Sequence, residues 1–448
     1  MNDLFPPFEW YRVVIEPWTA GAATSVWIVV MGALVAISCA LIGCFLVLRG
    51  MSLIGDAISH AVLPGIALAF LLSGSRASFP MFVGAAIFGV LTAVLIETVY
   101  KNSRIKEDAS MGVVFPTLFA VGVILISLLA DKVDLDQECV LYGEIAFIPL
   151  EDRTVLLGMT LGPEPVMIMA FVCGLIILGI VLFYRPLLVA SFDPALATSL
   201  GFSAIVIHYA MMTMLSLTIV SAFESVGAIL VVSMLIAPAA TAYMLTDRLS
   251  RMLMVSTVHG VLSALGGWHL SVWLECSTAG AMVVVGTGLF LAAFVFSPSH
   301  GLVARLTRRV KLTRRVADEN VLGALIRGEE EGTAAFTTWA LAEYLRLPAP
   351  QVARVVKRLR RRKWLLAIAG DQVGLTYTGR GEATRVLRAH RLWETLLSRE
   401  VGLPGDHLHD AAAHLEHYID TDTLETLDAT LGRPDVDPHG SAIPTSNR

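Results

Sequence analysis

Nine long apolar runs dominate the first two thirds of this 448-residue chain. Each has about 17 to 25 residues, the length that an α-helix needs to cross the hydrocarbon core of a bilayer. Across the whole chain 55% of the residues are hydrophobic and 16% are charged, more apolar than a soluble domain. We therefore expect an all-α polytopic membrane protein with about nine transmembrane helices. The runs lie near 24–48, 57–73, 79–100, 111–130, 166–184, 204–222, 226–245, 252–271 and 279–297.

The distribution of basic residues predicts where the membrane part ends. The stretch after Ser299 is one third of the chain and holds two thirds of the lysines and arginines. Six of these lie between Arg305 and Arg315, which is typical of a stop-transfer anchor to anionic lipid. We predict a transmembrane domain at 1–300 and a basic juxtamembrane linker at 301–317, followed by a soluble part.

Charges in the short loops predict the orientation of the spans. The segments 100–108, 246–251 and 305–315 are basic and should be cytoplasmic, whereas 131–152 is acidic and should face outward. With an odd number of spans, the N-terminus lies outside the cell (inner) membrane and the soluble C-terminal domain lies in the cytoplasm.

Two ionisable residues, Asp56 and His60, stand at the start of the second run in "GDAISHAVLPG". They are four residues apart, so a helix presents them on one face, and Pro64 follows one turn later. A carboxylate and an imidazole together suit manganese, zinc or ferrous iron. The alternative is that Asp56 caps the span and His60 forms a hydrogen bond within the bundle. We expect His208, His259 and His269 in other spans to be interhelical histidines of this second kind, with a structural role.

Five blocks, in order, resemble the permease subunits of ATP-binding-cassette importers for manganese, zinc and iron. They are "LRGMSLIGDAISHAVLPGIALAF", "KEDASMGVVFPTLFAVGVILIS", "CVLYGEIAF", "SFDPALATSLGFS" and "VGAILVVSMLIAPAATAYMLT". The resemblance covers nearly all of 15–300 and implies that Asp56 and His60 bind the transported metal. It also implies an extracytoplasmic metal-binding protein, and a second permease that is either a copy or a paralogue.

The resemblance further assigns "FDPALATSLG", 192–201, as the short coupling helix that docks onto an ATPase subunit. Asp193, Pro194 and Ala195 would begin that helix and Gly201 would end it. Asp followed by Pro is typical of a capped helix start, although an ordinary linker helix has the same pattern. The chain contains no GxxxxGK[ST] phosphate loop and hence no nucleotide site of that kind, so we expect a separate ABC ATPase to hydrolyse ATP.

The soluble part begins with a pattern of helix, turn and helix in "FTTWALAEYLRLPAPQVARVVKRLRRRKWLL". Two short β-prone runs joined by "GDQVG" follow, which predicts a winged helix-turn-helix domain at 318–378. The second helix is strongly basic, and this density suits contacts with DNA phosphates, although a solvated face has the same composition. The candidate DNA-binding residues are Arg354, Lys357, Arg358 and Arg361.

From "LTYTGRGEATRVLRAHRLWETLL" onward the chain resembles the metal-dependent repressors of the diphtheria-toxin-repressor and manganese-regulator family. The resemblance implies a helical metal-binding and dimerisation domain at 379–448, with a disordered tail. In the family pattern His390, Glu394 and His409 match one metal site, while Glu416 and His417 match part of a second. The second site departs from the pattern at Ala413 and at about Asn320, where relatives carry ligands.

These features together predict a metal-importer permease that carries a cytoplasmic repressor-like domain, with the metal as substrate and possible effector. The domain would be a sensor, a dimerisation module or a repressor with altered metal preference. The alternative is a membrane-tethered or proteolytically released metal-dependent transcriptional regulator. An intramembrane hydrolase that uses a metal-bound water is disfavoured, because the sequence contains no HExxH motif.

Overall fold

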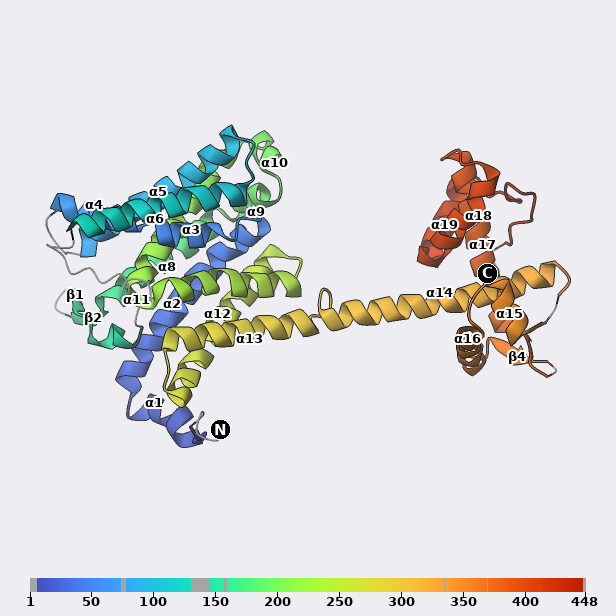
Figure 1. Cartoon of the computed structure of the whole chain (residues 1–448), viewed down its shortest axis with the longest axis horizontal. Coiled ribbons are helices and arrows are strands. Elements are labelled where there is room, and N and C mark those ends of the chain that lie inside the picture. Colours follow the sequence, from blue (N-terminus) through green and yellow to red (C-terminus); the bar gives the residue numbers. More distant parts are fainter. Residues whose placement is uncertain are drawn as a thin grey trace. The chain divides into compact units, whose positions relative to one another are not determined.

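The computed structural model describes residues 6–73, 78–129, 145–156, 159–333, 335–368 and 370–445. The chain forms two compact units, Met1–Ala304 and Arg305–Arg448. The first is helical apart from one hairpin, and the second combines helices with a small three-stranded sheet (Figure 1). The predicted fold class is confirmed in both units. Most of the acidic segment predicted to face outward, 131–152, lies outside the described residues, which resume at residue 145.

Within the described residues, nine helical segments of the first unit are long and apolar enough to cross a membrane. The helices of this unit are α1 (Glu16–Thr19), α2 (Ala22–Leu48), α3 (Ile54–Ala61), α4 (Leu63–Ser73), α5 (Ser78–Asn102), α6 (Glu107–Leu129), α8 (Glu164–Leu182), α9 (Tyr184–Phe192), α10 (Pro194–Ser199), α11 (Ala204–Leu245), α12 (Leu249–Leu274) and α13 (Thr278–Phe296). A short π-helix, Tyr11–Ile15, precedes the first α-helix, and a 3₁₀ helix, Ile145–Leu150, and a hairpin of β1 (Arg153–Leu156) and β2 (Met159–Pro163) lie between α6 and α8.

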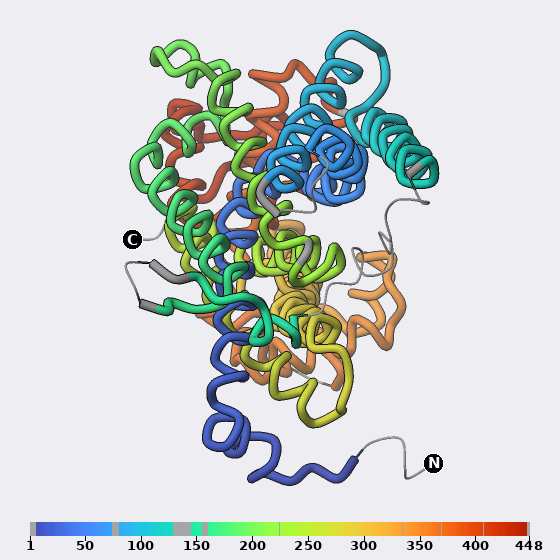
Figure 2. Tube along the Cα trace, turned by 90° about the vertical axis from the view of Figure 1, so that its left-hand side faces the viewer, coloured from blue at the N-terminus to red at the C-terminus, as the bar shows by residue number. Residues whose placement is uncertain are grey.

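Helix α2 runs through the middle of this bundle and packs against α8, α11 and α12 (Figure 2). Its residues are apolar on all sides, as expected for a helix that is buried all round. The backbones of α2 and α11 come close at Gly43, where an added Cβ atom would lie 1.9 Å from the carbonyl oxygen of Leu235. Only glycine fits there, and small residues at such contacts are typical of packed membrane helices.

Two local breaks in the backbone lie within the predicted spans or between them. The second span is interrupted at Val62, between α3 and α4 and just before Pro64, since proline cannot donate the helical hydrogen bond. The predicted spans 204–222 and 226–245 are both present, at Ala204–Phe223 and Ser225–Leu245, and share the label α11. Gly227, with φ 78° and ψ 162°, forms a non-helical kink where they join.

The second unit contains one three-stranded antiparallel sheet in the order β3-β5-β4. Its elements are α14 (Leu302–Glu330, of which the residues from Arg305 belong to this unit), β3 (Phe336–Thr337), α15 (Thr338–Tyr344), α16 (Ala349–Arg361), β4 (Leu365–Ala367), β5 (Gln372–Leu375), α17 (Tyr377–Arg399), a turn at Gly405–His407, α18 (Leu408–Leu415), a turn at Glu416–Tyr418 and α19 (Thr421–Thr430). Helix, turn, helix and hairpin follow each other as the sequence predicts. The segment predicted as a linker, 301–317, is helical from Leu302 on.

Side-chain periodicity and caps explain the helices of this unit. In α16 the apolar residues Val352, Val355, Val356 and Leu359 are buried, whereas most of the basic residues between them are exposed. This spacing covers one face of a helix, so the apolar face packs against α14 and α15 in the core. The hydroxyl of Thr376 accepts a hydrogen bond from the N–H of Gly379 and caps α17.

A smaller core lies under α17 and α19, around Leu392, Ile419 and Leu424. The chain after α19 folds back onto it as far as residue 445, where the sequence analysis expects a disordered tail. Arg391 donates a hydrogen bond to the carbonyl oxygen of Ala442 at 2.5 Å, and Ile443 is buried. These contacts order this segment, while residues 446–448 lie outside the described residues.

Candidate functional site

Asp56 and His60 lie on α3, in its first and last turns. Because they are one helical turn apart, His60 Nε2 lies 3.6 Å from Asp56 Oδ1. Both side chains are partly exposed, 43% for Asp56 and 31% for His60. The imidazole is flanked by Phe115 and Phe119 of α6, with ring centroids 6.1 and 6.0 Å away. The aromatic rings limit its movement while its edge stays open.

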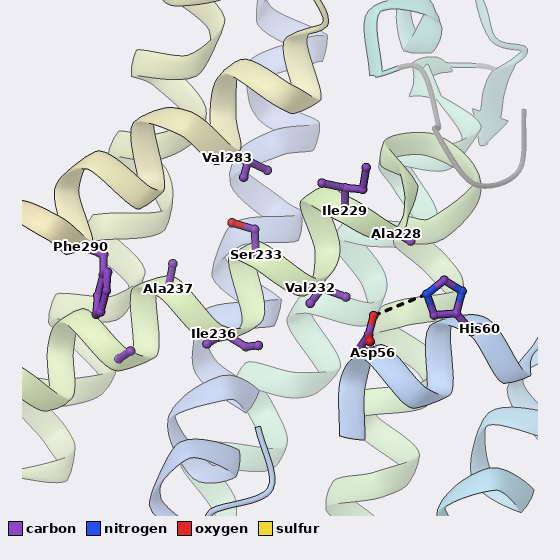
Figure 3. A pocket seen from close by; sticks show the side chains of 11 residues that line it. Asp56, His60, Ala228, Ile229, Val232, Ser233, Ile236, Ala237, Val283 and Phe290 are labelled. Atoms are coloured by element: carbon purple, nitrogen blue, oxygen red, sulfur yellow. Dashed lines mark ion pairs between the residues drawn. The ribbon is translucent and has the colours of Figure 1, made fainter. Parts of the chain in front are cut away.

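The pair faces a cavity of about 610 Å³. Residues of α11, from Ala228 to Ala240, form most of the wall, and Val283 and Phe290 of α13 complete it (Figure 3). Asp56 and His60 are the only ionisable groups among the lining residues. A metal ion in this cavity would therefore meet one carboxylate and one imidazole in uncharged surroundings, where the hydroxyl of Ser233 is the other polar side-chain group among the lining residues.

Two ligands are fewer than a transition metal needs, since zinc in proteins is almost always four-coordinate and manganese prefers more. In the part of the chain that the structure describes, no third His, Cys, Asp or Glu joins Asp56 and His60 in a cluster. The remaining positions would be filled by water, by backbone carbonyls or by a second permease subunit.

The three other histidines in the spans have partners of their own. His259 Nε2 lies 3.1 Å from the carbonyl oxygen of Gly286, and His269 Nδ1 lies 2.9 Å from that of Val13. His208 Nε2 lies 3.4 Å from a carboxylate oxygen of Glu97. These contacts agree with the expectation of interhelical histidines, and none of the three lines the cavity.

The predicted coupling segment forms the short helix α10, which Asp193 caps. The Oδ1 atom of Asp193 accepts hydrogen bonds from the backbone N–H groups of Ala195 and Leu196, both at 2.9 Å. Pro194 occupies the first helical position, where its missing N–H costs nothing. Gly201, with φ +88°, ends the turn in a left-handed conformation that favours glycine.

Apolar side chains project from this capped helix and its flanks. Phe192, Leu196 and Leu200 are 63%, 48% and 56% exposed. A short rigid helix with exposed leucine and phenylalanine side chains can dock into a groove of another protein.

A second cluster of metal-ligand residue types lies in the C-terminal unit, where α17 meets α18. His390 and Glu394 share one face of α17, with His390 Nε2 3.1 Å from Glu394 Oε1. His409 of α18 completes the group: its Nδ1 lies 2.9 Å from His390 Nε2 and 3.3 Å from Glu394 Oε1. One ligand atom from each residue lies within 4.8 Å of the others, which fits coordination of one metal ion.

The burial of this cluster is uneven. The side chains of His390 and Glu394 are 4% exposed, whereas that of His409 is 60% exposed. Burial alone would lower the pKa of His390, but hydrogen bonds with Glu394 and Glu416 raise it above its usual value. Burial would raise the pKa of Glu394, but its contacts with His390 and His409 lower it. The site thus has a fixed inner wall and one ligand open to solvent.

Glu416 and His417 lie in the turn after α18 and adjoin this cluster without forming a separate cage of their own. Glu416 Oε2 lies 2.6 Å from His390 Nδ1. His417 Nδ1 lies 2.7 Å from Oε2 of Glu319, a residue of α14 that the sequence analysis did not identify. Glu319 directly precedes Asn320, near which the resemblance to the repressor family predicts a ligand, and that adjacency is the signal the sequence offers.

The carboxylate of Glu319 is already occupied by basic groups. Its Oε1 accepts hydrogen bonds from Arg315 at 2.9 Å and from Arg385 at 2.6 Å. Burial would raise the pKa of Glu319, but hydrogen bonds with His417 and Arg315 and the charge of Arg385 lower it. Two guanidinium groups so close disfavour a metal cation at this carboxylate.

The candidate DNA-binding residues of α16 fall into two groups. Lys357 and Arg361 are exposed and have no carboxylate partner among the described residues, and Arg354 donates to the carbonyl oxygen of Pro350 at 3.2 Å. Arg358 instead pairs with the buried carboxylate of Asp318, with Nε and Nη2 at 2.8 and 2.5 Å from Oδ1. Its contacts are structural, whereas the other three side chains face solvent.

Two family patterns match parts of the chain. That of the ABC 3 transport family (ABC-3) matches residues 23–297. That of the iron dependent repressor, metal binding and dimerisation domain matches residues 376–445. The first contains Asp56, His60 and α10, and the second contains the cluster of His390, Glu394 and His409.

Known proteins resemble the chain over the first of these regions. The chain is 46% identical over 291 residues to the manganese transport system membrane protein MntD of Bacillus subtilis (strain 168), covering 65% of this chain and 98% of that protein. It is 41% identical over 337 residues to the zinc transport system membrane protein TroD of Treponema pallidum (strain Nichols), covering 75% and 91%. Among solved structures, PsaBC from Streptococcus pneumoniae in complex with Fab is similar, with 34% identity and a TM-score of 0.53 over 64% of this chain and 96% of that chain.

Proposed function

The chain belongs to the ABC 3 transport family, and we propose that it is the permease subunit of an ATP-driven importer of manganese, zinc or iron. The observation that carries this proposal is the Asp56–His60 pair on the wall of an otherwise uncharged membrane cavity. Ionisable groups are costly within a membrane and mark transport pathways. A carboxylate and an imidazole hold a borderline divalent cation well enough to select it and, with an incomplete shell, weakly enough to release it.

The energy for transport would come from a separate ATPase subunit. The capped helix α10 with its exposed apolar side chains supports a role as the docking element for that subunit. An extracytoplasmic metal-binding protein would deliver the ion, and a second permease subunit would complete the pathway. The basic loops support an inner-membrane orientation with the N-terminus outside and the C-terminal unit in the cytoplasm.

Metal uptake in reconstituted vesicles tests the transport proposal. The permease, with its ATPase, would be reconstituted as the wild type, as Asp56→Ala with His60→Ala, and as Ser233→Ala. Ser233 lines the same cavity but offers no charge, so it serves as the matched control. We expect the double variant to lose ATP-dependent uptake and Ser233→Ala to keep it. Equal uptake by all three would refute the assignment of Asp56 and His60.

We further propose that the C-terminal unit senses the transported metal through His390, Glu394 and His409. Their proximity, with one imidazole open to solvent, supports a site that fills from the surrounding solution. Ligand binding that favours one conformation of this unit would let cytosolic metal regulate the importer. This reading is favoured over the alternative of a tethered or released transcriptional regulator, because the permease family pattern covers more than half of the chain.

Metal binding to the full chain in the absence of ATP tests the sensor proposal. His390→Ala should remove one binding site while leaving the site of Asp56 and His60 intact, and the transport-site double variant should do the reverse. His414→Ala is the control, because His414 lies on α18 outside the cluster. If His390→Ala leaves the number of bound ions unchanged, the cluster is not a metal site.

A further inference from the structure

A second cavity, of about 740 Å³, lies within the C-terminal unit, and none of His390, Glu394 and His409 lines it. Residues of α14, α16 and α17 and the start of α19 line it. Six cationic residues contribute to the wall, against four carboxylates. The cations are Lys311, Arg314, Arg315, Arg358, Arg362 and Arg385. The lining therefore has an excess of two positive charges.

Two of the four carboxylates, Asp318 and Glu319, are buried and each forms ion pairs with two arginines. Asp318, whose side chain is 3% exposed, pairs with Arg358 and with Arg362, the latter at 3.3 Å. Glu319, whose side chain is 4% exposed, pairs with Arg315 and Arg385. These ion pairs fix the four guanidinium groups in place around the cavity.

The guanidinium groups have N–H donors that these ion pairs do not occupy. Each has five N–H donors, and the contacts among the described residues occupy only part of them: Arg362, for example, uses Nη1 on Asp318. Preorganised groups of this kind lose little conformational entropy when they bind an anion, and their planar fork matches the oxygens of a phosphate.

Lys311 and Arg314 are the two cations without a carboxylate partner among the described residues. They are three residues apart on α14, so they stand next to each other on one wall of the cavity. Like charges at this spacing repel each other unless an anion lies between them. They account for the excess positive charge of the lining.

We propose that this cavity binds a phosphate group. A phosphate monoester carries close to two negative charges at neutral pH, which balances the excess of the lining, and its oxygens accept hydrogen bonds from lysine and from several arginines at once. The phosphate belongs either to a soluble phosphate ester or to the headgroup of an anionic lipid. A lipid headgroup is one of the two sources because α14, which lines the cavity, begins at Leu302, only six positions after the apolar helix α13 ends at Phe296.

The cavity and the candidate metal ligands do not share residues, but Glu319 contacts both. Glu319, which fixes Arg315 and Arg385 at the cavity, also contacts His417. The proposal does not depend on the transport function or on metal binding.

Binding of inorganic pyrophosphate to the full chain tests the proposal. Equilibrium dialysis would use the protein in nanodiscs of zwitterionic lipid, as the wild type and as two double variants, Lys311→Ala with Arg314→Ala and Arg305→Ala with Arg308→Ala. The second pair is the control, because Arg305 and Arg308 are exposed cations of the same helix that do not line the cavity. We expect the first pair to weaken binding about tenfold or more, since each lost charge-assisted hydrogen bond is strong, and the control pair to leave it unchanged.

A second arm distinguishes the sources of phosphate. Nanodiscs that contain phosphatidic acid should displace pyrophosphate if the natural ligand is a lipid headgroup and should leave it bound if the ligand is soluble. Absence of saturable binding in zwitterionic nanodiscs would overturn the proposal. So would equal weakening in the two double variants, because that result would reduce the effect to general attraction by a basic helix.

Discussion

His417 Nδ1 lies 2.7 Å from Oε2 of Glu319, although the two residues are 98 positions apart in the sequence. The contact joins the turn after α18 to α14. Through Glu416 and His390 it continues to the candidate metal centre. The place where the resemblance predicts part of a second metal site thus holds a carboxylate that is paired with two arginines.

Replacing Glu319 should destabilise the C-terminal unit. In Glu319→Gln two guanidinium groups and His417 lose a buried anion, and breaking a buried pair of this kind costs about 3 kcal/mol. Hydrogen exchange of α14 and α17 in the full chain should become faster. Glu331→Gln, an exposed carboxylate after the end of the same helix, should leave the exchange unchanged.

The lowered pKa of Glu319 predicts how the stability of the C-terminal unit changes with pH. The pKa of Glu319 is lower in the folded state than the value of about 4.3 in an unfolded chain. Its contribution to stability is therefore present above about pH 4.3 and is lost as the pH falls through the lower, folded-state pKa. The stability difference between wild type and Glu319→Gln should shrink as the pH falls below about 4.3; a difference that grows there would contradict this sign.

Removing the cap of α10 should weaken coupling without affecting insertion into the membrane. Asp193→Ala leaves the N–H groups of Ala195 and Leu196 without their acceptor, which costs about 1 kcal/mol of helix stability. We expect fewer metal ions transported per ATP hydrolysed. Ser203→Ala is the control. Ser203 caps the long helix α11 through a weaker hydrogen bond, 3.4 Å long, from the N–H of Val206, so its loss should have a smaller effect. An equal number of metal ions transported per ATP in wild type and Asp193→Ala would refute the docking role of α10.

The contact between α2 and α11 should not tolerate a methyl group. In Gly43→Ala the new Cβ meets the carbonyl oxygen of Leu235, a backbone atom that cannot rotate away. Overpacking of this kind costs about 1–3 kcal/mol or more. The melting temperature of the detergent-solubilised protein should fall, whereas Gly288→Ala in α13, where an added Cβ has no neighbour within 4 Å, should melt like the wild type.

The basic residues of α16 should separate into those that bind DNA and one that stabilises the fold. If the C-terminal unit binds DNA, Lys357→Ala and Arg361→Ala should each lower the affinity and reduce the slope of its salt dependence by about 1. Arg358→Ala should also speed hydrogen exchange, because it leaves the buried Asp318 with a weaker partner. Fluorescence anisotropy at several salt concentrations measures the affinities, and three equal salt slopes with no change in exchange would contradict this division.

Much of the architecture follows from the sequence alone. Runs of apolar residues predict spans because backbone groups in a bilayer must be satisfied within the helix. A local spacing such as that of Asp56 and His60, or of His390 and Glu394, is converted directly into proximity by the helical repeat. The cap by Asp193 is predicted for the same reason, since it involves residues two and three positions away.

What the sequence did not reveal depends on long-range packing. The pairing of Glu319 with His417 joins elements whose approach no local pattern encodes. Arg358 is indistinguishable from Lys357 in a run of basic residues, and only the fold places it on Asp318. The kink at Gly227 likewise needs the backbone conformation, because a glycine between two apolar runs fits a loop equally well.

The central claim is that one chain both imports a metal and senses it, and a single experiment with vesicles tests both parts. ATP-dependent metal uptake would be measured with and without metal on the cytoplasmic side, for the full chain and for a truncation after Gly301, each with and without Asp56→Ala and His60→Ala. We predict that the double variant abolishes uptake in both forms, and that the truncation keeps uptake but loses its response to cytoplasmic metal. Uptake that survives the double variant, or a truncation that responds to cytoplasmic metal like the full chain, would contradict the account.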